Sequence, residues 1–251
     1  MVQAKKHLGQ HFLKNLDIAK NISDAISSDF EGDILEIGPG MGVLTQFLIK
    51  KNNQIFALDI DKESIDYLNK NYSESSNLKI IEADFLRINL EEMSKKEIAI
   101  IGNFPYNISS QILFKILEYK PKIPEMVGMF QKEVAERVVA KHGNKTYGIL
   151  SVLIQAYFKT EYLFTVDENE FNPPPRVKSA VIKLTKYRNT IGNDALLHQI
   201  VKTGFGQRRK KLSNALKSLI IPEHIQNHSF MDLRAEQLSV ENFIELTAIW
   251  K

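Results

Sequence analysis

The chain of 251 residues contains no cysteine, one tryptophan and six histidines. The absence of cysteine excludes a disulfide framework, a thiolate nucleophile and a cysteine-based zinc site. The histidines lack the paired spacing that is typical of metal ligands, so we expect no bound metal.

Long apolar runs are absent as well. No segment reaches the roughly 20 consecutive apolar residues that a membrane-spanning helix requires. Residues 1–10 have no apolar core of the kind found in a signal peptide. We therefore expect a cytoplasmic protein that does not associate with a membrane.

A strong overall charge is also lacking, since the formal net charge is only +3 and the isoelectric point is about 8.8. Any surface that binds nucleic acid must therefore come from local clusters of basic residues. Hydrophobic residues make up 43% of the chain and charged residues 25%, which is typical of a folded globular protein. The length accommodates one sizeable α/β domain with a small appendage.

Up to residue 187, short apolar segments alternate with segments of helical periodicity, which predicts a mostly parallel sheet covered by helices. The expected strands are 33–38, 54–59, 78–84, 97–102, 125–130, 161–166 and 177–185, and the expected helices include 62–71, 108–117, 131–140 and 147–158. The last two strands have no helix between them, so one should be antiparallel. Beyond residue 187 only helical patterns remain. We expect one domain over 1–187, with a basic arm at 1–14, and a small helical domain over 188–251.

The stretch Asn103-Phe104-Pro105-Tyr106 ends the expected strand 97–102. Pro105 donates no hydrogen bond to a sheet and disfavours helix at the preceding residue, so the strand must stop there. An amide and an aromatic ring are thus presented at the carboxyl end of a strand, where open α/β sheets bind ligands. A strand end that carries a core tyrosine is the competing interpretation.

Three other expected strands end in a glycine loop or an acid. Gly38, Gly40 and Gly42 follow the first, and such a loop lets a ligand approach the backbone at a helix amino end, although it also suits a plain tight turn. Asp59 ends the second strand and is placed to accept ribose hydroxyls. Asp84 ends the third strand, where it is placed to meet an adenine amino group. A site for ribose and adenine without a diphosphate indicates S-adenosylmethionine.

Two further segments carry candidate contacts to RNA. Arg208, Arg209, Lys210 and Lys211 form a basic run at the expected start of a helix, where cations oppose the helix dipole. A phosphate backbone would offset that cost, whereas a solvated charge run is the alternative. Lys5 and Lys6 add a second basic cluster. The proline-rich segment 171–179 either offers the ring of Phe171 for stacking or is a crossover loop with a buried phenylalanine.

The chain resembles the KsgA/Dim family of ribosomal RNA adenine dimethyltransferases. The matching segments lie in family order and span nearly the whole sequence: Gly9-Gln-His-Phe-Leu13, Glu36-Ile-Gly-Pro-Gly40, Asn103-Phe-Pro-Tyr106, Phe171-x-Pro-x-Pro-x-Val-x-Ser179, Phe205-Gly-Gln-Arg-Arg-Lys210 and Arg234-Ala-Glu-Gln-Leu-Ser239. The last two favour the bacterial KsgA branch over the erythromycin-resistance methyltransferases. The resemblance implies a Rossmann-like class I methyltransferase sheet of seven mostly parallel strands and a small all-helical carboxyl-terminal domain.

The resemblance also implies a reaction and a set of site residues. Two adjacent adenosines near the 3′ end of 16S ribosomal RNA, within a pre-30S particle, would each be methylated twice on N6, by a monomeric enzyme, with S-adenosylhomocysteine as the other product. The implied cofactor contacts are His11, Leu13, Gly38, Gly40, Asp59, Asp84, Phe85 and Asn103. The family often has Asn at position 11, Glu at 59 and Leu at 104, so the role of the His11 side chain stays open.

For catalysis we predict that the Asn103 carboxamide oxygen and the Phe104 carbonyl accept the two hydrogens of the target amine. Pro105 fixes the bend, Tyr106 stacks on the extruded base, and Phe171 covers its other face. Two alternatives remain: methylation of large-subunit RNA, as in erythromycin resistance, and a ribosome-assembly checkpoint factor without turnover.

Overall fold

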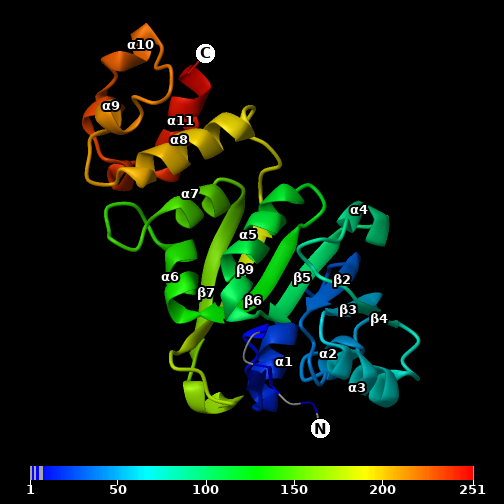
Figure 1. The fold of residues 1–251 in the computed structure, drawn as a ribbon. Coiled ribbons are helices and arrows are strands. Elements are labelled where there is room, and N and C mark those ends of the chain that lie inside the picture. Colours follow the sequence, from blue (N-terminus) through cyan, green and yellow to red (C-terminus); the bar gives the residue numbers. More distant parts are fainter. Residues whose placement is uncertain (1, 3, 6–7, 251) are drawn as a thin grey trace. The chain divides into compact units, whose positions relative to one another are not determined.

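The computed structural model describes residues 2, 4–5 and 8–250 (Figure 1). Contacts divide the chain into two compact units, each of which combines two segments. The first unit comprises the residues up to Ala135 together with Glu161–Lys186, and the second comprises Glu136–Thr160 with Tyr187–Lys251. Residues 136–160 thus group with the carboxyl-terminal segment, whereas we expected them in the first domain.

A seven-stranded sheet has the order β4-β3-β2-β5-β6-β9-β7. Its strands are β2 (Asp33–Ile37), β3 (Ile55–Asp59), β4 (Leu78–Glu82), β5 (Ile98–Asn103), β6 (Glu125–Gln131), β7 (Phe158–Val166) and β9 (Ser179–Lys186). Strands β2 to β6 pair in parallel and β9 pairs antiparallel with β6. The predicted mostly parallel sheet of seven strands is confirmed.

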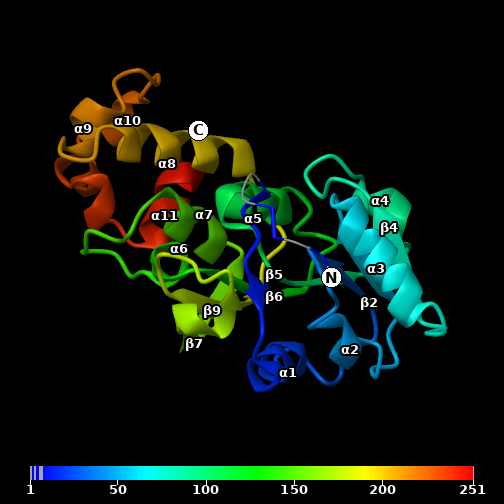
Figure 2. The same cartoon turned by 60° about the horizontal axis from the view of Figure 1, so that its bottom comes forward.

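The helices of the first unit follow its strands along the chain: α1 (Leu16–Asp24), α2 (Thr45–Leu48), α3 (Lys62–Tyr72), α4 (Leu90–Met93) and α5 (Ser109–Glu118). In Figure 2, α1 and α2 lie on one side of β5 and β6, and α5 lies on the other. Helix α1 begins at a side-chain cap, because Asn15 accepts hydrogen bonds from the backbone N–H groups of Asp17 and Ile18.

The core of this unit lies between the helices and the central strands. Strands β2 and β3 are buried at every residue, as expected for parallel strands with both faces covered. Ala99 and Ile101 of β5 pack in one cluster with Ile22 of α1. Burial of a large aliphatic side chain such as Ile22 contributes roughly 1.5–3 kcal/mol.

The strand order reverses at the centre of the sheet. From β2 the chain builds outward through β3 and β4, and it then returns to place β5 on the other side of β2. In open α/β sheets a ligand binds outside the carboxyl ends of the strands at such a switch point. The switch point lies where β2 leads into the glycine loop and β5 ends at Asn103.

A two-stranded ribbon joins segments that are far apart in the sequence. Strand β1 (Phe12–Leu13) pairs antiparallel with β8 (Phe171–Asn172), so that Leu13 lies opposite Phe171. Neither strand was predicted, since two residues are too short to show a periodic pattern.

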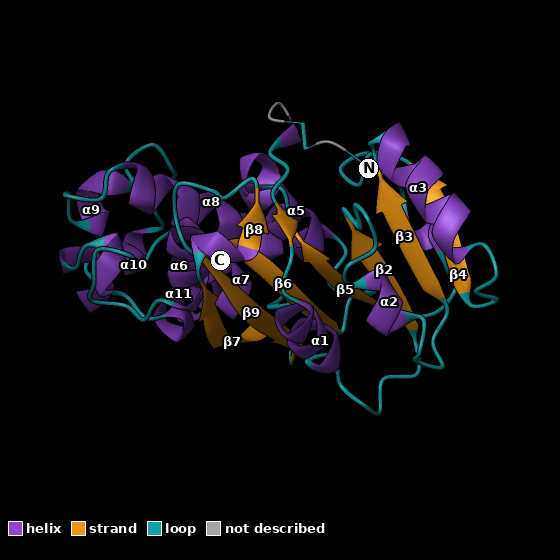
Figure 3. Ribbon diagram, turned by 90° about the horizontal axis from the view of Figure 1, so that it is seen from below, coloured by secondary structure: helices purple, strands orange, loops and turns teal. Residues whose placement is uncertain are grey.

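The second unit consists mainly of helices: the end of α6 (Lys132–Val139), α7 (Ile149–Gln155), α8 (Asp194–Gly206), α9 (Leu212–Ala215), α10 (Glu223–Gln226) and α11 (Val240–Ile249). Helix α8 packs against α7, α9 and α11, and the ring of Phe205 contacts those of Tyr147 and Phe243. Past β9 the described residues form helices and loops without a further strand (Figure 3).

Two expectations about local structure were wrong. The helix expected over 147–158 ends at Gln155, because the chain enters β7 at Phe158. The basic run does not open a helix: α8 ends at Gly206 and α9 begins at Leu212, so the run forms the connection between them. Arg208, Arg209 and Lys210 therefore do not lie in the first turn of a helix, and the predicted cost of opposing a helix dipole does not arise for them.

Candidate functional site

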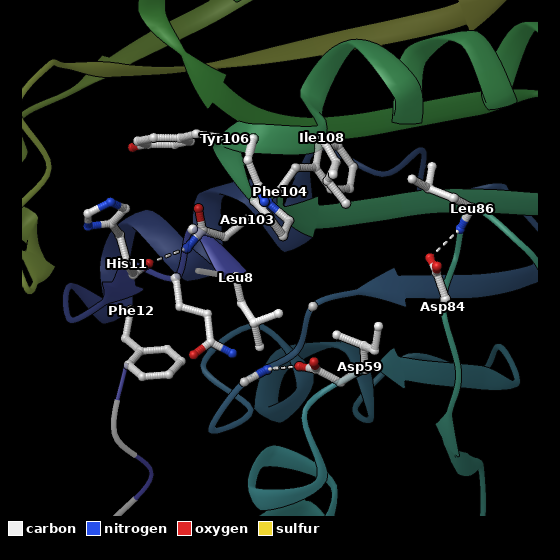
Figure 4. A pocket seen from close by; sticks show the side chains of 17 residues that line it. Leu8, His11, Phe12, Asp59, Asp84, Leu86, Asn103, Phe104, Tyr106 and Ile108 are labelled. Atoms are coloured by element: carbon white, nitrogen blue, oxygen red, sulfur yellow. Dashed lines mark hydrogen bonds between the residues drawn. The ribbon is translucent and has the colours of Figure 1, made fainter. Parts of the chain in front are cut away.

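A cleft of about 190 Å³ lies at the carboxyl ends of the parallel strands (Figure 4). It receives one polar group or loop from each of four neighbouring strands: the glycine loop after β2, Asp59 of β3, Asp84 after β4 and Asn103 of β5. The other lining residues are Leu8, Gly9, Gln10, His11, Phe12, Ile60, Leu86, Phe104, Pro105, Tyr106, Asn107 and Ile108. All of these residues belong to the first unit.

The glycine loop turns tightly at the cleft. Gly38 and Gly40 have φ angles of 68° and 54°, in the left-handed region that side-chain-bearing residues rarely adopt. A Cβ on Gly40 would lie 2.9 Å from the ring of Phe12, so this position has no room for a side chain. A Cβ on Gly38 would meet Pro105 and the Asn103 carbonyl at ordinary contact distances, which means that it would fill the space between the loop and β5.

Asp59 is buried beside this loop. Its Oδ2 accepts a hydrogen bond from Gly40 N at 3.2 Å, and its Oδ1 accepts one from Asp61 N at 2.9 Å. Burial raises the pKa of Asp59, and these backbone N–H groups oppose the rise. Each carboxylate oxygen retains a lone pair for a further donor, so the group is able to accept two ligand hydroxyls.

Asp84 follows β4 and stands at the start of a turn. Its Oδ1 accepts the backbone N–H of Leu86 at 2.9 Å, and its Oδ2 lies 3.3 Å from Nε of the exposed Arg87. The carboxylate thus shapes the turn and lines the cleft together with Leu86.

Glu36, in the strand before the glycine loop, is fully buried. Its Oε2 accepts the hydroxyl of Thr45 at 2.6 Å, whereas its Oε1 has no hydrogen-bond partner among the described residues. Burial raises the pKa of the Glu36 carboxyl to about 8. A cavity of about 30 Å³ is lined by Glu36 and shares Phe12, Gly38 and Asn103 with the cleft. A buried oxygen without a partner at this position is suited to a cationic donor.

Asn103 has a fixed amide. Its Nδ2 donates to the backbone carbonyl of His11 at 2.8 Å, and this bond determines which end of the carboxamide faces away from His11. The Oδ1 atom is thereby left as the acceptor at the end of β5. The structure also shows that the His11 backbone contributes to the site through Asn103.

Tyr106 and His11 form a stacked pair whose ring centroids are 5.3 Å apart. The Tyr106 hydroxyl hydrogen-bonds to Ser179 Oγ, and His11 Nδ1 lies 2.8 Å from the carbonyl oxygen of Pro173. Three separate motifs of the sequence, at 9–13, 103–106 and 171–179, therefore meet at one edge of the sheet.

Phe104 points its ring into the sheet. The ring lies 4.9 Å from that of Phe130, and the backbone N–H of Phe104 donates to Met129 O. Two glycines make room for the ring, since a Cβ on Gly102 or Gly128 would lie 2.8 Å or 2.1 Å from its atoms. Only the backbone of Phe104 is left for a role in the cleft.

Several residues expected at the site lie elsewhere. Phe171 is 1% exposed and packs in the core with Leu13, so its ring does not line the cleft, and Phe85 is buried as well. Leu13 lines the small cavity beside Glu36 rather than the cleft itself. The structure therefore matches the alternative interpretation of 171–179, a crossover loop with a buried phenylalanine. Lys5 Nζ bonds to Asp61 Oδ1 and lies 3.0 Å from Glu63 Oε1, and Lys6 lies outside the described residues.

The basic run of the second unit divides into two pairs. Arg208 donates from Nε to Glu236 and from Nη2 to the Asn144 carbonyl, and Lys211 Nζ bonds to Asp232 at 2.9 Å. Arg209 and Lys210 are exposed and form no ion pair within the part of the chain that the structure describes.

The apolar walls of the cleft were not predicted from the sequence. Ile60 is 55% exposed although it is aliphatic, and Leu86 lies on the neighbouring turn. The sequence signal was an isoleucine between two acids, Asp59 and Asp61, directly after a buried strand. Together Ile60 and Leu86 supply apolar surface for a flat ring between Asp59 and Asp84.

Among the described residues, no three His, Asp or Glu side chains gather in a way that would hold a metal ion. None of the described helices combines the length and the apolar character needed to cross a membrane.

A family model for ribosomal RNA adenine dimethylase matches residues 1–251. The chain belongs to the ribosomal RNA adenine dimethylase family. This finding confirms the resemblance that the sequence motifs indicated.

Two relatives show how similar the family members are. The chain is 55% identical over 250 residues to the ribosomal RNA small subunit methyltransferase A of Flavobacterium johnsoniae. The matched region covers 98% of this chain and 95% of the relative. It is 53% identical over 251 residues to the protein of the same name from Phocaeicola vulgatus, with 98% and 89% covered.

Solved structures have the same fold. A dimethyladenosine transferase from Plasmodium falciparum matches with a TM-score of 0.82 and 27% identity, over 94% of this chain and 96% of that one. The 23S ribosomal RNA methyltransferase ErmE matches with a TM-score of 0.73 and 24% identity, over 95% of this chain and 99% of that one. The Rossmann-like methyltransferase fold predicted for this chain is thereby confirmed.

Proposed function

We propose that this protein transfers methyl groups from S-adenosylmethionine to the N6 amines of two adjacent adenosines near the 3′ end of 16S ribosomal RNA. It would act as a cytoplasmic monomer on a pre-30S particle. The observation that carries the proposal is the fixed carboxamide of Asn103, whose Nδ2 is bound to His11 O while its Oδ1 remains at a cleft that also contains Asp59 and Asp84. Family membership and relatives named small subunit methyltransferases support it.

The cleft and the small cavity beside it fit S-adenosylmethionine in four respects. Asp59 retains acceptors for the two ribose hydroxyls, and Asp84 with Ile60 and Leu86 suits an adenine ring and its amino group. Gly38 leaves room for the methionine part, and the unpartnered Oε1 of Glu36 suits its α-ammonium group. The cofactor supplies a methyl group on a sulfonium, which is already a strong electrophile.

The protein therefore contributes mainly geometry. The amine of adenine is a weak nucleophile because its lone pair is delocalised into the ring. Asn103 Oδ1 and the Phe104 carbonyl would accept the two amine hydrogens and favour a pyramidal nitrogen with its lone pair directed at the methyl group. Such positioning contributes up to roughly 7–11 kcal/mol in favourable cases.

Tyr106 would hold the extruded base by stacking, which contributes about 1–3 kcal/mol. Its hydroxyl is fixed by Ser179, so the orientation of the ring is set before the base arrives. The imidazole of His11 covers one face of Tyr106. The base would therefore stack on the opposite face of the Tyr106 ring, or it would displace the imidazole and stack in its position.

In the second unit Arg209 and Lys210 would contact the phosphate backbone, because their charges are not used within the described structure. Arg208 and Lys211 would mainly shape this connection through Glu236 and Asp232.

Labelled methyl transfer to small subunits that lack the modification tests the proposal, with naked 16S RNA and large subunits as controls. We expect label in two adjacent adenosines near the 3′ end of the small-subunit RNA. Label in large subunits alone would contradict the proposed substrate. Binding to small subunits without any transfer would indicate an assembly factor that does not turn over.

A further inference from the structure

Helix α5 carries a lysine that the proposed mechanism does not use. The side chain of Lys115 is nearly buried, at 8% exposure. Its Nζ donates to the carbonyl oxygens of Leu86 and Ile88, at 3.0 and 2.6 Å. Both carbonyls belong to the turn that follows β4.

This turn is the part of the cleft that carries Asp84. Within it, the backbone N–H groups of Arg87 and Ile88 donate to the Asp84 carbonyl, and the N–H of Leu86 donates to Asp84 Oδ1. These three hydrogen bonds hold the turn around Asp84, and Lys115 binds two other carbonyl oxygens of the same turn. Asp84 and Leu86 line the cleft, whereas Lys115 does not.

Burying the ammonium group of Lys115 costs free energy, and its hydrogen bonds to the turn offset that cost. Burial lowers the pKa of Lys115, although the charges of Glu118 and Asp84 oppose the change. Lys115 forms no ion pair with any described residue, and its Nζ lies 5.5 and 5.4 Å from the ring centroids of Phe85 and Tyr119. Its two strong hydrogen bonds both go to the turn, which they fix to α5.

We propose that Lys115 is the positioning residue for the adenine end of the cofactor subsite: it fastens the 84–88 turn to the helix that follows Asn103-Phe-Pro-Tyr106. The proposal rests on the proposed function, in which Asp84 receives the adenine amino group. It links the cofactor side of the cleft to the acceptor side through one side chain, since α5 begins three residues after Tyr106. Lys115 touches neither substrate nor cofactor.

Substitution Lys115→Met removes both hydrogen bonds and keeps most of the side-chain volume. We expect the dissociation constant of S-adenosylhomocysteine, measured by calorimetry on the full chain, to rise about tenfold, because two charge-assisted bonds to the turn are lost. The KM for S-adenosylmethionine should rise in parallel while kcat changes little. Lys115→Arg should restore part of the affinity.

A comparison of two ligands separates positioning from general loosening. The wild type should prefer S-adenosylhomocysteine to S-inosylhomocysteine, which lacks the adenine amino group. Lys115→Met should reduce this preference, whereas a loosened protein would lose affinity for both ligands alike. The matched control is Lys122→Met, because Lys122 is equally buried but bonds to Glu91 of α4, outside the cleft.

Unchanged affinity and ligand preference in folded Lys115→Met overturn the proposal, and Lys115→Gln replaces it in the same assays if the methionine variant does not fold. Hydrogen exchange should show faster exchange at Arg87 and Ile88 in either variant, and exchange unchanged there would also overturn it. Failure of the wild type to bind S-adenosylhomocysteine would instead contradict the proposed function.

Discussion

At the scale of single residues, Asn103 illustrates how one contact assigns a role. Its amide nitrogen is bound to the backbone of His11, so its oxygen is the end left for a ligand. A glutamine or asparagine with two free ends would be able to rotate and present a donor to the amine, which would be unproductive. The fixed amide thus gives the acceptor a single orientation.

We expect Asn103→Ala to lower kcat for methyl transfer by at least about 100-fold, because both the acceptor and its alignment are lost. Binding of S-adenosylhomocysteine, measured by calorimetry, should weaken far less. Asn107→Ala is the matched control, since Asn107 lines the same cleft but is exposed. Undiminished methylation by the Asn103 variant would remove it from the mechanism.

The buried carboxyl of Glu36 makes the stability of the protein depend on pH. The folded chain holds a proton on this carboxyl up to about pH 8, whereas the unfolded chain loses it near pH 4.5. This contribution to stability is therefore complete below about pH 4.5 and is lost as pH rises towards 8, by up to about 1.4 kcal/mol per pH unit. Glu36→Gln should flatten the fall in the free energy of urea unfolding between pH 5 and 8.

The raised pKa of Asp59 also makes the free energy of unfolding fall with rising pH. Because Asp59 is present in both proteins, its effect cancels when their pH profiles are compared. Parallel pH profiles of the wild type and Glu36→Gln would contradict the assignment. The protonated Glu36 carboxyl should also release its proton when the cationic cofactor binds, which calorimetry in buffers of different ionisation enthalpy would detect.

At the scale of elements, the pairing of β5 and β6 depends on two glycines opposite each other in register. Gly102 lies opposite Gly128, and both leave room for the ring of Phe104. The sequence predicted the two strands from their apolar residues but gave no reason for these glycines. Their function is visible only once Phe104 is seen to turn inward.

We expect Gly128→Ala to destabilise the protein by about 1–3 kcal/mol, because the new methyl group would lie within the space of the Phe104 ring. The shift of Phe104 should also displace its carbonyl and reduce kcat. Chemical denaturation and methyl-transfer assays measure the two effects. Gly148→Ala is the control, since no atom lies within 4 Å of a Cβ at that position; equal stability of both variants would contradict the packing argument.

At the scale of the whole molecule, the described basic residues fall into those that bind acids of the chain and those that do not. The free pair, Arg209 and Lys210, is the part of the basic run available to RNA without breaking an internal ion pair. We expected all four cations of the run to contact RNA, and the ion pairs of Arg208 and Lys211 make Arg209 and Lys210 the stronger candidates.

Replacing Arg209 and Lys210 with serine should weaken RNA binding and reduce the slope of log affinity against log salt concentration by about one to two units. Binding titrations at several salt concentrations measure the slope. Lys95 and Lys96 are the matched control pair, since they are exposed and adjacent but precede β5 at the amino ends of the strands. An unchanged slope would exclude Arg209 and Lys210 from the interface.

The sequence by itself determined the parallel strands, the glycine loop, the acids at the ends of β3 and β4, and Asn103 at the end of β5. These features follow from local apolar runs and from the residues that terminate them, and the motif order added the family. Boundaries failed where two elements share one apolar run, as at 147–158, because periodicity does not show where a helix gives way to a strand.

Only the tertiary structure decided which groups meet. Asn103 binds His11 across 92 positions of sequence, Tyr106 binds Ser179 across 73, and Lys115 binds the turn of Asp84 across 27 to 29. The tertiary structure also buries Phe171 in the core and pairs Lys5, Arg208 and Lys211 with acidic side chains. Such contacts depend on chain reversals and on the packing of distant elements, for which local sequence patterns carry no signal.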